Sequence, residues 1–225
     1  MLLSHNTRGY FENHGGTKPP VMIFLLMGLN ILVYALHALN SPDSKASRPL
    51  AQLRKSILDG SGRLGQTIGL GEATLENMTL VPTEFYRAPG EQWKTLIGSM
   101  FTHANLAHLL FNMAALYKFG RPLEHVLGGL KVFTIYMVSG IMTNLIYATT
   151  NRKSPIGIVG ASAAISGIGA AYFLEYADRR NMQTWLMFQI VGALLAQGSG
   201  VSFVSHLIGF AVGAIVYLLL KHFKL

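Results

Sequence analysis

Cysteine is absent from this 225-residue chain, and charged residues make up only 12% of it, about half the share of a typical soluble domain. The missing thiols exclude disulfides, iron–sulfur clusters, cysteine-ligated zinc and a cysteine nucleophile within the chain. Any catalytic group must therefore be a hydroxyl, an imidazole, an amide or a carboxylate. With 51% hydrophobic residues, so little charge argues against a soluble globular protein.

Acidic residues are the scarcer charge, with 10 Asp and Glu against 18 Lys and Arg and a net charge of +8. The basic residues are scattered between long apolar runs, where they act as membrane topology signals rather than as a nucleic-acid surface. We therefore expect the lipid bilayer, and no nucleic acid, as a partner. The first apolar run is too long for a cleavable signal peptide, so we expect it to be retained.

Apolar windows of about the length that a helix needs to cross a bilayer occur six times. They cover about 21–39, 101–120, 130–150, 157–176, 184–197 and 202–220, and the fifth is the shortest. The predicted fold is an all-α polytopic membrane protein, a bundle of six transmembrane helices over 21–220. An N-terminal cytoplasmic segment at 1–20 precedes it, and a C-terminal cytoplasmic tail at 221–225 follows it.

The orientation follows from the charges of the short loops, because Lys and Arg are enriched on the cytoplasmic side. With the N-terminus inside, nine basic residues lie on the inner side, against Arg152 and Lys153 outside. Both termini are therefore expected in the cytoplasm. The long first loop, about 40–100, is extramembrane. Its Leu50, Leu53 and Ile57 fit either an amphipathic helix on the bilayer surface or an ordinary loop helix.

Polar groups inside hydrocarbon are costly unless they find partners, so their positions in the windows are informative. The second, fourth and sixth windows run in the same direction, and residues near their N-terminal ends therefore share one membrane face. Five polar residues lie there: His103, His108, Asn112, Ser162 and His206. Each group alone is more often structural, since a membrane serine usually bonds its own i−4 carbonyl. Their common depth favours a buried hydrolytic site.

Ser162 follows Pro155, Gly157 and Gly160, which break helices. We expect it in the first turn of a short helix, where unbonded N–H groups and the positive end of the helix dipole favour an oxyanion.

Gly209 and Gly213 follow His206 at i+3 and i+7, which makes one small-residue helix face. Packing that face on the fourth window would bring an imidazole to Ser162 as general base.

His108 and Asn112 are four residues apart and face one way, so both could donate to the oxyanion. His103 and His108, five residues apart, would lie about 140° apart on a helix. That separation argues against a shared metal ion, and we expect no metal.

These residues resemble a known family, the rhomboid intramembrane serine proteases. The run His103-Ala-Asn-Leu-Ala-His108-Leu-Leu-Phe-Asn112 is similar to that family's signature. Further similar motifs are Gly120 with Glu124, Gly160-Ala-Ser162, His206 with Gly209 and Gly213, and Trp93-Lys94, where the family has Trp-Arg. The resemblance covers about 91–220.

The resemblance implies a serine endopeptidase with a Ser162–His206 catalytic dyad. It implies an oxyanion hole made by His108, Asn112 and the Ser162 amide, and no metal or cofactor. The implied supporting residues are His103, Gly160, Gly209 and Gly213. The implied substrates are single-pass membrane proteins, cut in or beside a transmembrane segment.

Two positions depart from the family pattern. Ala163 replaces a glycine, and Ser166 stands where the family mostly has an aromatic residue that packs on the catalytic imidazole. Phe210 or Tyr172 could supply the missing ring.

The alternative function is a catalytically inactive rhomboid-like protein that binds transmembrane clients, although the retained Ser, His, His and Asn favour the enzyme. A small transporter would instead place its polar residues at the bilayer midplane. The first twenty residues lack the Arg-rich amphipathic pattern of a mitochondrial targeting peptide. We therefore expect the prokaryotic plasma (inner) membrane as the location.

Overall fold

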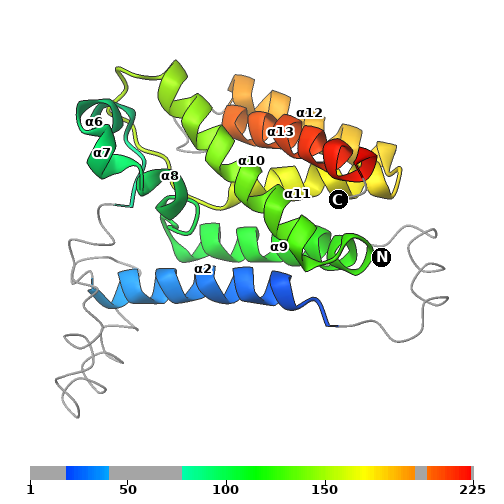
Figure 1. Ribbon diagram of the computed structural model, residues 1–225. Helices are drawn as coiled ribbons and strands as arrows, with labels where there is room; N and C mark the ends of the chain where they lie inside the picture. Colours follow the sequence, from blue (N-terminus) through cyan, green and yellow to red (C-terminus); the bar gives the residue numbers. More distant parts are fainter. Residues whose placement is uncertain (1–18, 41–77, 196–201, 224–225) are drawn as a thin grey trace, which may run out of the picture.

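The computed structural model describes residues 19–40, 78–195 and 202–223 (Figure 1), and the regular secondary structure within these ranges is helical apart from one isolated β-bridge. The six long helices of the described part are α2 (Val21–Asn40), α9 (Leu106–Leu127), α10 (Gly129–Thr150), α11 (Ser162–Glu175), α12 (Arg179–Leu195) and α13 (Phe203–His222). Three short helices precede α9, namely α6 (Pro82–Arg87), α7 (Pro89–Gln92) and α8 (Thr95–Gly98).

Each long helix overlaps one of the six predicted windows. By length and hydropathy, three described helices can cross a membrane, those at Val21–Ala38, Gly129–Thr150 and Phe203–His222. The six crossings therefore stay a prediction, and the surface helix expected near Leu50 lies outside the described residues.

The second window, 101–120, was placed too early. The Asn105 side chain caps the N-terminus of α9 by accepting a hydrogen bond from His108 N at 2.9 Å, so the helix begins at Leu106.

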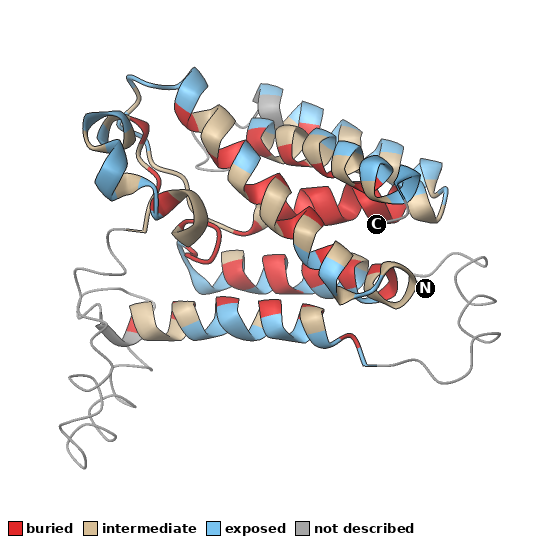
Figure 2. Cartoon of the chain, viewed as in Figure 1, coloured by how far each residue is buried: buried red, intermediate tan, exposed pale blue. Residues whose placement is uncertain are grey.

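Helix α11 is the centre of the bundle and contacts α9, α10, α12 and α13. Most of its residues are buried, whereas α2 and α12 each turn an apolar face outward (Figure 2). Its small side chains allow this crowding. A Cβ at Gly209 of α13 would overlap the Ala163 carbonyl, and one at Gly213 would overlap the backbone of Gly167. The predicted glycine face of α13 therefore packs on α11, backbone against backbone.

Helix α2 is held to α9 by Glu124. Its carboxylate accepts hydrogen bonds from Met22 N and Ile23 N, both at 2.9 Å, and so satisfies the N-terminus of α2. Gly120, one turn earlier, leaves room for the Ile23 side chain. The Gly-x-x-x-Glu motif thus has a structural role, as the joint between these two helices.

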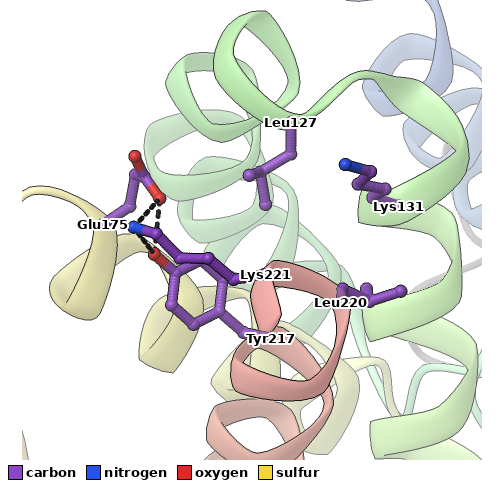
Figure 3. Close-up of a pocket in the computed structure, with 6 residues that line it drawn as sticks. All are labelled: Leu127, Lys131, Glu175, Tyr217, Leu220 and Lys221. Atoms are coloured by element: carbon purple, nitrogen blue, oxygen red, sulfur yellow. Dashed lines mark hydrogen bonds and ion pairs between the residues drawn. The ribbon is translucent and has the colours of Figure 1, made fainter. Parts of the chain in front are cut away.

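The C-terminal ends of α11 and α13 are joined by a polar cluster (Figure 3). The Tyr217 hydroxyl donates to Glu175, and Lys221 Nζ lies 3.3 Å from the same carboxylate and 2.9 Å from the Tyr217 oxygen. Glu175 thus forms an ion pair at the opposite end of α11 from Ser162.

We predict that Gly213→Ala destabilises the bundle by about 1–3 kcal/mol, because the new methyl group forces α11 and α13 apart. Gly28→Ala in α2 is the matched control, since no described atom beyond the adjacent backbone of its own helix lies within 4 Å of its Cβ position. The control should be neutral or stabilising, because glycine in a helix interior is less stable than alanine by about 0.5–1 kcal/mol. Unfolding midpoints in detergent measure both; equal effects of the two changes would contradict the packing.

Candidate active site

The segment that leads into α11 is fixed by the short helices and the residues just before them. Leu80 and Ile158 pair their backbones through hydrogen bonds of 3.2 and 3.0 Å, and Gly160 N donates to Ser99 O at 2.8 Å. Gly160 has φ +119°, a conformation that side chains disfavour. The turn at Gly160 ends this segment and starts α11 at Ser162, as the helix-breaking residues predicted.

Ser162 and His206 meet across the α11–α13 contact. His206 Nε2 lies 2.8 Å from Ser162 Oγ, which is hydrogen-bond distance. Both side chains are half-buried and belong to the first turn of their helices. The arrangement places a hydroxyl beside an imidazole, as the small-residue face of α13 predicted, and such a pair can act as nucleophile and base.

Gln189 of α12 is the third member of this chain of hydrogen bonds. Its Oε1 lies 2.8 Å from His206 Nδ1, and the side chain is 5% exposed. We did not predict this residue, because we treated the window at 184–197 as a plain apolar span. The sequence did contain a signal, since Gln189 is a polar residue within the run Leu-Met-Phe-Gln-Ile-Val. A polar residue within a membrane helix usually faces the bundle interior and pairs with another polar group.

His108 and Asn112 face the turn that carries Ser162. A Cβ at Gly160 would lie 2.8 Å from His108 Nε2 and 3.7 Å from Asn112 Nδ2, so both groups converge on that backbone. The Asn112 side chain is buried, and its Nδ2 has no hydrogen-bond partner among the described residues. The site therefore holds a buried donor group that no described residue uses.

His103 precedes α9 instead of lying on it. Its Nδ1 is 3.3 Å from Phe101 O, and its ring centroid is 5.1 Å from that of His108 with an interplanar angle of 66°. The predicted separation of 140° was wrong, because it assumed one continuous helix through both residues. His103 packs on His108, which fits a supporting role.

The aromatic contact to His206 comes from an unexpected residue. Ser166 donates to Ser162 O at 2.7 Å, back along its own helix. The Phe203 ring lies 5.9 Å from the His206 ring, edge to face. Phe210 stacks on Trp185 and Tyr172 packs on neighbouring rings, so neither is the substitute that we suggested.

Comparisons with known proteins show the family of this chain. Residues 90–223 match the Rhomboid domain, which is more than half of the chain. The chain belongs to the rhomboid family. It is 28% identical over 226 residues to RHOMBOID-like protein 7 of Arabidopsis thaliana, covering 93% of this chain and 71% of the relative.

Some relatives are named as proteases. Rhomboid protease AarA of Providencia stuartii is 31% identical over 180 residues, which cover 65% of this chain and 64% of that protein. Rhomboid-type serine protease 2 of Emericella nidulans is 29% identical over 134 residues, 55% of this chain and 26% of that protein. With its apolar helices, the chain is a membrane protein of a family that includes serine proteases.

Proposed function

We propose that this protein is an intramembrane serine endopeptidase. The observation that carries the proposal is the 2.8 Å contact between Ser162 Oγ and His206 Nε2 at the N-terminus of a buried helix. In the proposed reaction the Ser162 oxygen attacks a peptide carbonyl while His206 takes its proton, and His206 then gives that proton to the leaving amine. A water molecule, activated by the same imidazole, hydrolyses the acyl-enzyme.

The negative oxygen of the tetrahedral intermediate needs donors that are already in place. His108 Nε2 and Asn112 Nδ2 converge beside the turn before Ser162, and the Ser162 N–H belongs to the first helical turn, where amides lack intrahelical partners. These three groups form the proposed oxyanion hole. The unused Asn112 donor supports this assignment, because a buried amide without a partner is costly unless a substrate supplies one.

The length of α11 supports a site below the membrane surface. Its 14 residues span about 21 Å at 1.5 Å per residue, against a hydrocarbon thickness of about 30 Å. If the Glu175–Lys221 ion pair marks one membrane surface, Ser162 lies some 9 Å short of the other. We propose as substrates the transmembrane or juxtamembrane segments of single-pass membrane proteins, which can reach that depth.

The proposed topology has six crossings with both termini in the cytoplasm. It rests on the nine inner and two outer basic residues of the short loops. We propose the prokaryotic plasma membrane as the location, because the first twenty residues lack the Arg-rich amphipathic pattern of a mitochondrial targeting peptide.

We predict that a fluorophosphonate probe labels the detergent-purified wild type and labels neither Ser162→Ala nor His206→Ala. The probe reacts with a serine only when a neighbouring base activates it. Ser166→Ala is the matched control, because Ser166 lies on the same helix and bonds a backbone carbonyl instead of an imidazole; it should label.

The contrary result is a wild type that fails to label while an active relative labels in parallel. The Ser162–His206 pair would then be inactive. The alternative function, an inactive rhomboid-like protein that binds transmembrane clients, would replace the proposed protease function.

We also predict that Asn112→Ala slows cleavage about 10²- to 10³-fold, the usual loss for one oxyanion donor, with little loss of stability. Asn144→Ala deletes the same atoms but breaks hydrogen bonds to Leu96 O at 2.8 Å and Ser99 Oγ at 2.9 Å. It should cost about 1–3 kcal/mol more in unfolding free energy than Asn112→Ala. Cleavage of a model transmembrane substrate and unfolding in detergent measure the two effects; normal cleavage by Asn112→Ala would contradict the assignment.

A further inference from the structure

We propose that Gln189 is a positioning residue, which holds the His206 imidazole in the tautomer and orientation that let it act as a base toward Ser162. The proposal rests on the proposed function, since it concerns how the same dyad is made competent.

The direction of the two hydrogen bonds to His206 determines its tautomer. An amide oxygen can only accept, so His206 Nδ1 carries the proton that it donates to Gln189 Oε1 at 2.8 Å. In a neutral imidazole the other nitrogen then has the lone pair. His206 Nε2 is therefore the acceptor toward the Ser162 hydroxyl at 2.8 Å, which is the arrangement that a general base requires.

The burial of Gln189 indicates that α12 is arranged around this bond. Among the α12 side chains that the structure describes, Gln189 is the buried one, while its apolar neighbours Met187, Phe188 and Ile190 are exposed by 44–66%. Burying an amide is unfavourable unless it finds a partner. The helix nevertheless turns its polar residue inward, where His206 is the partner.

The surroundings of His206 leave this role to Gln189. Ser166 directs its hydroxyl to Ser162 O, and Phe203 meets the imidazole through a ring contact at 5.9 Å, which restrains the ring but accepts no proton from Nδ1. Gly192, one turn after Gln189, gives the Phe203 ring its space, because a Cβ there would lie 2.6 Å from Phe203 Cδ1. Helix α12 thus supplies the hydrogen-bond partner of Nδ1 and the room for the ring beside it.

The test compares the rates at which a fluorophosphonate labels purified full-length variants. Gln189→Leu removes the acceptor, and its maximal labelling rate should fall about 10- to 100-fold, the usual cost of a misplaced catalytic group. The probe concentration for the half-maximal rate should stay within about twofold, because probe binding does not use His206 Nδ1. Gln189→Glu keeps an oxygen acceptor and should restore most of the rate. Gln183→Leu, the same change at an exposed position of α12, should behave as wild type.

A spectroscopic readout makes the test independent of labelling. Imidazole ¹⁵N spectra, with the His206 signals assigned by their loss in His206→Ala, should show a protonated Nδ1 and an unprotonated Nε2 in the wild type. In Gln189→Leu the two tautomers should mix.

Each contrary outcome is distinct. If Gln189→Leu labels at the wild-type rate, the positioning role is overturned and the proposed function is not affected. A slow Gln189→Leu that Glu does not restore, with an unchanged His206 spectrum, overturns it in favour of a structural role. A wild type that does not label overturns the proposed function, and the positioning role of Gln189 is overturned with it.

Discussion

Backbone atoms of α11 and α13 touch because Gly209 and Gly213 put no side chain between α13 and the backbone of Ala163 and Gly167. Lipid tails are as apolar as the helix surfaces, so membrane helices associate through such close van der Waals packing. The same contact sets the relative depth of the two helices. It places the first turn of α13 beside the first turn of α11, and the 2.8 Å separation of His206 and Ser162 follows from it.

The buried polar groups divide into those that stabilise the bundle and those that the fold leaves unused. Asn144 and Glu124 bond across helix boundaries and hold elements together. Of the four buried side-chain atoms without a partner in the described ranges, Asn112 Nδ2 and His103 Nε2 lie next to the His108 ring or the turn before Ser162. An unused buried donor lowers stability. Asn112 Nδ2 lies beside the turn before Ser162, and in the proposed reaction the developing oxyanion is the partner that this donor lacks.

The sequence predicted the six long helices, the start of α11 and the helix face that brings His206 to Ser162, because these depend on local patterns of apolar, small and helix-breaking residues. It did not predict which side chains reach the far side of the imidazole. Phe203 and Phe210 lie on the same helix as His206, three residues before it and four after it, so their spacing allows either ring to meet the imidazole. The structure favours Phe203, because the Phe210 ring stacks on Trp185 of α12, and no periodicity specifies that packing. Gln189 was missed for the same reason, since an apolar window does not show which of its faces points inward.

Helix α12 is held in the bundle by different contacts from those that join α11 and α13. The α11–α13 contact is rigid, because separating backbones that touch means losing their packing outright. Among its described side chains α12 buries one, Gln189, and packs on α13 and α11. A displacement of α12 would release His206 Nδ1 while the 2.8 Å contact to Ser162 stayed in place. In the proposed mechanism, α11 and α13 set the Ser162–His206 distance and α12 sets the His206 tautomer through Gln189. Correct Ser–His geometry would then support catalysis only while α12 is docked.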